Sequence, residues 1–242
     1  MLSLFKGKTL NKTIIVALDF SSLESALTCL DKLDPTLCRV KIGKELFTSA
    51  GPEAVKQATV RGFDVFLDLK FHDIPNTVAK AAVAVAEMGV WMLNVHAGGG
   101  FKMLAETRAA LNSFGKERPL LTGVTLLTSF SQSDLVAVGV SDDPDAHVLR
   151  LAQLAKDAGL DGVVCSAREA GLLREKCGEK FCLVTPGIRR NQDENNDQKR
   201  VQTPSEAIAS GSNFLVMGRP ITKAKDPMGV IRSIYESIEV YK

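Results

Sequence analysis

Eight short apolar runs, rich in β-branched residues, recur along the chain, and a segment with helical periodicity follows each of them. Near-continuous apolar runs of this length are typical of parallel strands that are buried on both faces. We expect strands at Thr13–Leu18, Arg39–Ile42, Asp64–Leu69, Trp91–Val95, Leu120–Leu127, Gly162–Cys165, Phe181–Val184 and Asn213–Met217.

The segments between these runs have amphipathic or alanine-rich patterns that predict helices. Eight strands that alternate with helices favour a closed parallel barrel. A doubly wound open sheet would explain the alternation but not the count of eight, and no G-x-G-x-x-G motif follows the first run. We expect helices at Ser22–Leu33, Pro52–Arg61, Pro75–Met88, Phe101–Asn112, Pro144–Ala158, Ala167–Lys176, Pro204–Ser210 and Pro227–Tyr241.

The length of the chain agrees with this architecture. Its 242 residues are close to the roughly 250 of a typical closed α/β barrel that forms one domain. No linker rich in proline, glycine or serine divides the sequence. We therefore predict that residues 1–242 form a single-domain (β/α)8 TIM barrel.

The charge and hydropathy patterns limit the partners. The net charge is +2 without a basic stripe, which argues against nucleic acid but not against a small anion. Met1–Lys8 is too short for a signal peptide, and the apolar stretch Val78–Val90 is too short to span a bilayer. Five cysteines without a C-x-x-C pair predict reduced, mostly buried thiols. We expect a cytoplasmic protein that binds neither nucleic acid nor membrane.

Ionisable residues stand at the ends of three apolar runs, where a buried strand should not carry them. Asp19 ends the first run, Lys41 lies within the second, and Asp68 and Lys70 end the third, with Asp73 three residues further on. Strand residues two apart share a face, so Asp68 and Lys70 should point the same way. In a barrel these are the C-terminal strand ends, where catalytic groups are found.

Each charge also has an ordinary structural explanation. Asp19 and Asp73 could cap the helices that begin near Ser22 and at Pro75, and the Lys41 ammonium could extend to the rim. Buried charges are costly unless they are paired, however, and four charges of alternating sign can satisfy one another. We therefore favour an Asp–Lys–Asp–Lys array that provides a preorganised electrostatic field.

The last two strands are followed by candidate anion-binding loops. Thr185-Pro186-Gly187-Ile188-Arg189 follows the seventh run and Met217-Gly218-Arg219-Pro220 follows the eighth. Barrels commonly build phosphate sites from these two loops, although Gly-Arg-Pro could also be a plain turn with a solvated arginine. The polar segment Arg189–Arg200 is either an exposed loop or a lid over the site.

The histidines do not form a recognisable metal site. His72, His96 and His147 lack the spacing of a ligand set, no H-E-x-x-H motif occurs, and no serine or cysteine nucleophile elbow is visible. Gly98-Gly99-Gly100 follows the fourth run and is interpreted as a turn into a helix. We predict a site without metal or cofactor.

The charged motif and its surroundings resemble the orotidine 5′-phosphate decarboxylase family, almost from end to end. Residues 68–77, DLKFHDIPNT, match the family signature D-x-K-x-x-D-I-P-N-T. Asp19 in Ala-Leu-Asp, Lys41 in Val-Lys-Ile-Gly and Thr128 in Leu-Leu-Thr-Ser also match, as do the two glycine-arginine loops. Gln198 lies in a stretch similar to the glutamine region of the family's phosphate loop.

The resemblance implies decarboxylation of orotidine 5′-phosphate to UMP without a cofactor, in the pathway of pyrimidine synthesis. Lys70 would protonate C6 of the pyrimidine, and Asp68 would lie near the substrate carboxylate. The resemblance also implies a homodimer in which Asp73 and Thr77 reach the neighbouring site. Substrate would be bound by Asp19, Lys41 and Asp73 at the ribose, Thr128 at the pyrimidine, and Arg189, Gln198, Gly218 and Arg219 at the phosphate.

Two alternatives stay open. A phosphosugar enzyme of the same suprafamily also carries D-x-K-x-x-D but normally uses a divalent metal; Lys41 and the long Arg189–Arg200 segment favour the nucleotide enzyme. A barrel that only binds phosphates or a partner protein would not need Lys70 as a proton donor among carboxylates.

Overall fold

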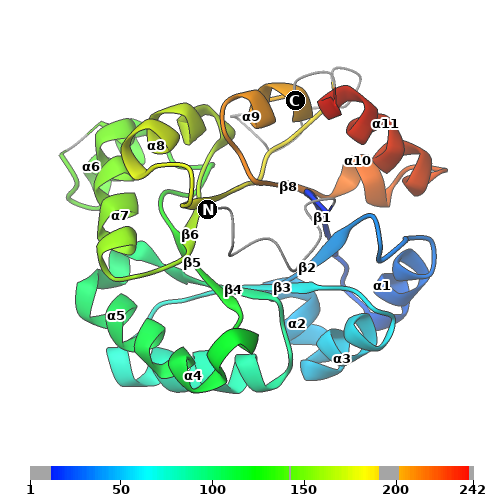
Figure 1. Cartoon of the computed structure of the whole chain (residues 1–242), viewed down its shortest axis with the longest axis horizontal. Helices are drawn as coiled ribbons and strands as arrows, with labels where there is room; N and C mark the ends of the chain where they lie inside the picture. Colours follow the sequence, from blue (N-terminus) through cyan, green and yellow to red (C-terminus); the bar gives the residue numbers. More distant parts are fainter. Residues whose placement is uncertain (1–11, 142, 191–201, 240–242) are drawn as a thin grey trace.

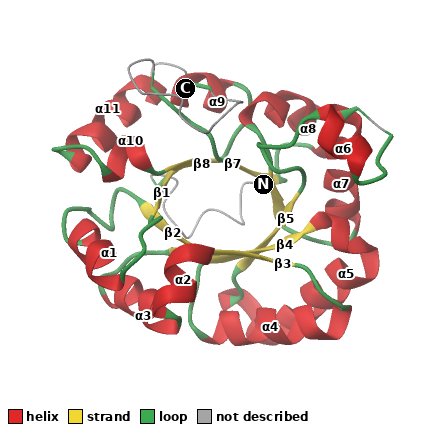
Figure 2. Ribbon diagram, turned by 180° about the vertical axis from the view of Figure 1, so that it is seen from behind, coloured by secondary structure: helices red, strands yellow, loops and turns green. Residues whose placement is uncertain are grey.

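The structure, a computed structural model, describes residues 12–141, 143–190 and 202–239. Its strands are hydrogen-bonded in chain order, all parallel, and β8 pairs with β1, so the sheet closes into a barrel. Figures 1 and 2 show the helices around the outside of this barrel, which confirms the predicted (β/α)8 TIM fold. The strands are β1 (Ile14–Ala17), β2 (Arg39–Gly43), β3 (Val65–Phe71), β4 (Met92–His96), β5 (Leu120–Val124), β6 (Gly162–Val164), β7 (Cys182–Thr185) and β8 (Phe214–Met217).

Every helix expected from the sequence is present, and several begin with proline, whose missing N–H is harmless at the first helical position. No helix in the described part of the chain is both long and apolar enough to cross a membrane. The α-helices are α1 (Leu23–Leu30), α2 (Lys44–Ala50), α3 (Pro52–Val60), α4 (Pro75–Glu87), α5 (Gly100–Ala110), α6 (Gln132–Ala137), α7 (Pro144–Asp157), α8 (Ala170–Cys177), α9 (Pro204–Ala209), α10 (Arg219–Thr222) and α11 (Pro227–Glu239), and the 3-10 helices are η1 (Ala97–Gly99), η2 (Leu111–Glu117) and η3 (Ala167–Glu169).

Three short α-helices were not expected: α2, α6 and α10. α2 follows β2 directly and anchors itself mainly through buried Leu46, too few apolar positions to give a periodic pattern. α6 begins with a capping box between Ser131 and Asp134, a signal that the sequence does contain. α10 begins at Arg219, where the sequence suggested only a turn.

The strand limits differ from expectation mainly at β3 and β5. β5 ends at Val124, three residues before the predicted Leu127, because Leu126 packs into the outer core after the chain has left the sheet. β3 continues to Phe71, two residues beyond the predicted Leu69, through an irregularity in its pairing with β4. The expected glycine turn after β4 is confirmed, since η1 leads directly into α5.

Along each strand, side chains point alternately into the barrel and outward to the helices, so the strands contribute to two separate apolar cores. Ile15, Phe66 and Met92 belong to the core inside the barrel, whereas neighbours such as Leu67 and Leu93 pack against the surrounding helices. Side chains two residues apart share a face, so Lys41, Asp68 and Asn94 also point inward. All five cysteines are buried free thiols, as expected.

A cation–aromatic cluster closes the N-terminal end of the barrel. The Arg39 guanidinium lies 4.2 Å from the centroid of the Trp91 ring and 5.2 Å from that of Phe214. Its Nε is 3.3 Å from Oδ2 of Asp64. Arg39 is 3% exposed, so both the ring faces and the carboxylate stabilise a charge that has lost its water.

We expect Arg39→Ala to lower the free energy of unfolding by about 2–4 kcal/mol, because it leaves a cavity between two rings and removes one of the two cationic partners of Asp64. Urea denaturation followed by circular dichroism measures this change.

Arg61→Ala is the matched control. Arg61 forms an ion pair with Asp31 at the surface, and such exposed pairs contribute about 1 kcal/mol or less. Equal losses in the two variants would contradict the role given to Arg39.

Candidate active site

Four charged side chains form a continuous series at the C-terminal ends of β1, β2 and β3. Lys41 Nζ lies 3.1 Å from Asp19 Oδ1 and 3.3 Å from Asp68 Oδ2. Lys70 Nζ lies 2.6 Å from the other oxygen of Asp68, Oδ1. The structure thus brings together the four residues Asp19, Lys41, Asp68 and Lys70, and we call this series the charged array.

The two central members of the array are buried, and their charges stabilise each other. Lys41 and Asp68 are 9% and 8% exposed. Burial opposes the charge of Lys41, but Asp68 and Asp19 outweigh it and raise its pKa above the ordinary value. Burial likewise opposes the charge of Asp68, but Lys41 and Lys70 outweigh it and lower its pKa. Both groups are therefore ionised at neutral pH.

Lys70 occupies an unusual backbone conformation. Its φ of 54° is the only positive value of a non-glycine residue in the described part of the chain. Between the pairs Leu67↔Leu93 and Phe71↔Val95, β3 advances by four residues while β4 advances by two. The strand therefore bulges at Asp68–Lys70, and such irregularities concentrate at functional sites.

Asn94, on the neighbouring strand β4, contacts this bulge and was not singled out from the sequence. Its Nδ2 donates to Asp68 Oδ1 at 2.7 Å, and its Oδ1 accepts from the Lys70 backbone N–H at 2.8 Å. The available signal was a polar side chain within the apolar run Trp91–Val95.

Two glycines give the array its space. A Cβ atom on Gly43 would lie 3.0 Å from Lys41 Nζ and 3.5 Å from Asp19 Oδ1. A Cβ on Gly218 would lie 3.7 Å from Asp19 Oδ2. Gly218 therefore borders the array directly, which connects the loop after β8 with the charged groups after β1 and β2.

Asp73 and Thr77 lie beyond the bulge and are exposed. Asp73 Oδ1 accepts from the N–H of Ile74 at 2.6 Å, and Asp73 has no ion pair within the described part of this chain. The helix-capping explanations are wrong for both acidic residues, because the N-cap of α4 is Ile74 and that of α1 is Ser22. Asp19 instead pairs with Lys41.

The residues expected to bind the phosphate lie after β7 and β8, and Thr128, expected at the pyrimidine, lies after β5. Arg189 is buried; its Nη1 donates to the carbonyl of Ile188 at 2.9 Å, and its backbone N–H donates to that of Gln202 at 3.0 Å. Arg219 is the first residue of α10, and Thr128 is half-buried in the loop after β5. Gln198 lies outside the described residues, as does most of the polar segment that contains it.

His72 and His96 lie side by side at the rim, with ring centroids 5.6 Å apart. Burial, followed by the charges of His72 and Lys44, lowers the pKa of His96, so its imidazole is neutral at neutral pH. Among the described residues, no group of three histidine, cysteine or acidic side chains could hold a metal ion.

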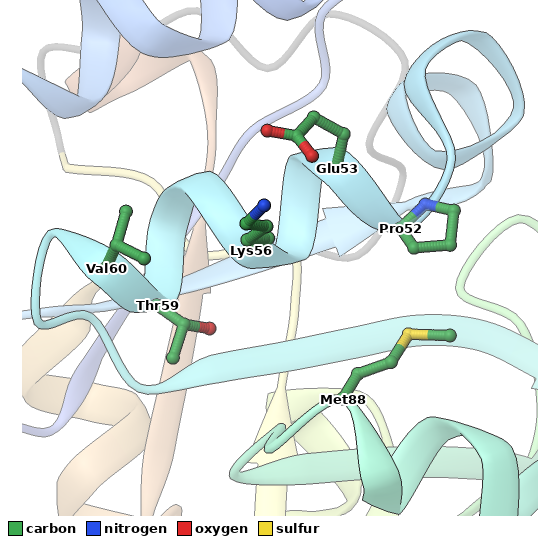
Figure 3. Close-up of a pocket in the computed structure, with 6 residues that line it drawn as sticks. All are labelled: Pro52, Glu53, Lys56, Thr59, Val60 and Met88. Carbon is green, nitrogen blue, oxygen red and sulfur yellow. The ribbon is translucent and has the colours of Figure 1, made fainter.

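A surface depression of about 320 Å³ lies away from the array, on the outside of the barrel (Figure 3). It runs along α3 and touches the end of α4 at Met88. No member of the array lines it, and its position on the helical layer does not mark the site. Its lining residues are Pro52, Glu53, Lys56, Thr59, Val60 and Met88.

Comparisons with known proteins agree on one family. The model of the orotidine 5′-phosphate decarboxylase / HUMPS family matches residues 12–234. Orotidine 5′-phosphate decarboxylase of Vibrio cholerae serotype O1 is 58% identical over 225 residues, which cover 93% of this chain and 97% of the relative. The enzyme of the same name from Vibrio vulnificus is 54% identical over 229 residues, 95% of this chain and 99% of the relative.

Solved structures give the same result. The crystal structure of orotidine 5′-phosphate decarboxylase from Lactobacillus acidophilus has a TM-score of 0.84 at 40% identity, covering 94% of this chain and 99% of that one. An uncharacterised conserved protein from Geobacillus kaustophilus has a TM-score of 0.82 at 37% identity, covering 93% and 99%.

The lowered pKa of Asp68 predicts how the array contributes to stability with pH. The ionised carboxylate stabilises the fold fully above its unfolded-state pKa of about 3.9, and this contribution is lost as pH falls through the lower folded-state pKa. We expect the advantage of the wild type over Asp68→Asn in free energy of unfolding to shrink as pH falls from about 5 to about 2.

Urea denaturation at several pH values measures this difference. Glu53→Gln, which removes an exposed carboxylate of α3, serves as the control. A difference between wild type and Asp68→Asn that does not change with pH would contradict the pairing described above.

Proposed function

The chain belongs to the orotidine 5′-phosphate decarboxylase / HUMPS family, and we propose that its charged array performs the decarboxylation with Lys70 as the proton donor. The chain converts orotidine 5′-phosphate to UMP in pyrimidine synthesis, as the names of its relatives indicate. The observation that carries the proposed mechanism is the 2.6 Å contact between Lys70 Nζ and Asp68 Oδ1, at the inner end of the array.

The reaction requires a fixed positive charge near C6. When the C6 carboxylate leaves as CO2, the electron pair of the broken bond stays in the plane of the pyrimidine ring, where the π system cannot delocalise it. The Lys70 ammonium stabilises this pair electrostatically and then transfers one proton to C6, which completes UMP and leaves a neutral amine. The proposed reaction needs no electron-accepting cofactor.

Asp68 holds Lys70 in position for both steps. Its Oδ1 accepts from the Lys70 ammonium, and its Oδ2 pairs with Lys41. A group held in this way does not have to reorganise when charge develops at C6, which is the main source of electrostatic catalysis. Lys41 links Asp68 to Asp19, and we assign Asp19 and Lys41 to the ribose hydroxyls.

The phosphate is assigned to the loops after β7 and β8. Arg219 and Arg189 supply charge-assisted donors, and Gly218 allows the backbone to approach closely beside Asp19. Gln198 would join them from the polar segment, and Thr128 would contact the pyrimidine edge. Binding energy from the phosphate, remote from C6, can then serve to orient the ring.

We assign Asp73 and Thr77 to the neighbouring site of a homodimer. Both are exposed at the start of α4, and they stand beside Ile74, an apolar side chain that is 66% exposed. Phe101, at the start of the adjacent helix α5, is 52% exposed. Apolar side chains exposed at one rim of the barrel support an interface there, which would place Asp73 near a second array.

We also assign the protein to the cytoplasm. Its five cysteines are buried free thiols, and thiols persist in reducing compartments. The substrate is a small molecule, so neither nucleic acid nor membrane is required as a partner.

We expect Lys70→Ala to lose decarboxylation by far more than the factor of about 10²–10⁴ typical of acid–base catalysis alone, because one group supplies both the charge and the proton. UMP should still bind, since its phosphate and ribose contacts remain. Loss of ultraviolet absorbance of the substrate, in EDTA, gives turnover, and calorimetry gives UMP affinity.

Lys102→Ala, on the exposed face of α5, should keep normal turnover. Lys70 would not be the central residue if its alanine variant retained a tenth of wild-type activity. Activity that vanished in EDTA and returned with Mg²⁺ would favour the metal-dependent phosphosugar alternative.

We expect Arg219→Ala to reduce kcat/KM for orotidine 5′-phosphate strongly, and Gln198→Ala to reduce it less, because both are assigned to the phosphate. Orotidine without phosphate should be a poor substrate for the wild type and should suffer little further from Arg219→Ala. Steady-state kinetics on both substrates measures these ratios, with Arg232→Ala on exposed α11 as control. Equal proportional losses on the two substrates would show that Arg219 acts through structure.

A further inference from the structure

Asn94 is a fully buried amide on the inward face of β4. The inward residue before it on this strand, Met92, belongs to the apolar interior core. A buried amide is costly unless its donor and acceptor are both satisfied. Both groups of Asn94 are satisfied by β3, and both bonds end on the Asp68–Lys70 bulge.

The first bond fixes the carboxylate of Asp68. Asp68 Oδ1 accepts from Asn94 Nδ2 at 2.7 Å and from Lys70 Nζ at 2.6 Å. The opposite oxygen, Oδ2, faces Lys41 Nζ at 3.3 Å. With donors on both oxygens, the carboxylate plane is held against rotation, so the oxygen that receives Lys70 stays at one place.

The second bond fixes the backbone from which Lys70 projects. Lys70 has a φ of 54°, and it lies where the register between β3 and β4 shifts. Its N–H donates to Asn94 Oδ1 at 2.8 Å. A non-glycine residue keeps such a backbone conformation only when its surroundings hold it there.

We infer that Asn94 is a positioning residue that sets both ends of the Asp68–Lys70 ion pair, a role that rests on the function proposed above for Lys70. The amide of Asn94 holds the carboxylate of Asp68, which accepts from the Lys70 ammonium, and it also holds the backbone of Lys70. The amide of Asn94 offers a donor and an acceptor at once, whereas an ionised aspartate in its place would only accept and would repel Asp68.

This role predicts a change in turnover and not in binding. Asn94 contacts neither Asp19, Lys41 nor the loops assigned to the phosphate through its two side-chain bonds. Its loss frees the Lys70 ammonium to move relative to C6, and a displacement of about 1 Å costs on the order of 10²-fold in rate. The affinity for UMP, which depends on the phosphate and ribose contacts, stays near that of the wild type.

The experiment compares Asn94→Ala and Asn94→Asp with the wild type, with Lys70→Ala and with Thr122→Val. Thr122 is the matched control: it is fully buried, it is the register partner of Asn94 on β5, and its hydroxyl donates to the carbonyl of Leu93 at 3.3 Å. Measurements are kcat, UMP affinity and thermal unfolding. Asn94→Asp preserves the side-chain volume, so it keeps the test available if the alanine variant does not fold.

We expect kcat of Asn94→Ala to fall by about 10²-fold at nearly unchanged UMP affinity, while Thr122→Val keeps wild-type kcat. In Asn94→Asp, burial and the charge of Asp68 should raise the pKa of the introduced carboxyl group, and only its protonated form can donate to Asp68. The kcat of Asn94→Asp, relative to wild type at each pH, should therefore rise as pH is lowered from about 8 to about 5.

Three results would overturn the inference: normal kcat in a folded Asn94→Ala, a loss of UMP affinity parallel to that of kcat, or no recovery of Asn94→Asp at low pH. If Lys70→Ala is inactive but Asn94→Ala has normal kcat, the role of Asn94 is wrong and the proposed mechanism stands. An active Lys70→Ala removes the proposed mechanism itself.

Discussion

A carboxylate that is buried at the C-terminal end of a barrel needs positive charge close to both of its oxygens, and Asp68 has this charge. Lys70 approaches Oδ1 at 2.6 Å and Lys41 approaches Oδ2 at 3.3 Å. Removing either cation would leave an uncompensated charge in a site of low dielectric. In the mechanism proposed above, the same arrangement holds the Lys70 ammonium beside C6, where negative charge develops, so the condition for burying Asp68 would also serve catalysis.

The barrel meets this condition through the alternation of its strands. Residues two apart share the inward face, so apolar residues such as Ile15 and Phe66 fill the interior, and the charged residues follow at the C-terminal ends. Gly43 leaves room for the Lys41 ammonium, because a Cβ there would lie only 3.0 Å from Nζ. At the opposite end, Arg39 packs against Trp91 and Phe214. Arg39 therefore stabilises the packing at the N-terminal end, whereas the charged array lies at the end whose loops differ among barrel enzymes.

The sequence was informative wherever a pattern repeats. The eight apolar runs predicted the eight strands, and the two-residue spacing of Asp68 and Lys70 predicted that their side chains point the same way; they lie 2.6 Å apart. The bulge at Lys70 was not predictable, because a positive φ at lysine arises from contacts with β4 that lie 24 residues away in the chain. Asn94 was overlooked for the same reason. α2 escaped detection because its burial depends mainly on Leu46. The dimer roles expected for Asp73 and Thr77 stay predictions, because they depend on a second chain.

The central claim is that the array stabilises a carbanion at C6 and that Lys70 exchanges a proton with this carbon. Exchange of the C6 hydrogen of UMP for deuterium, followed by NMR in D2O, tests both parts without loss of CO2. The account predicts that the wild-type protein catalyses this exchange, and that Lys70→Ala with UMP bound does not accelerate it above the rate without protein. Exchange by Lys70→Ala at the wild-type rate would contradict the account, because another group would then stabilise and protonate C6.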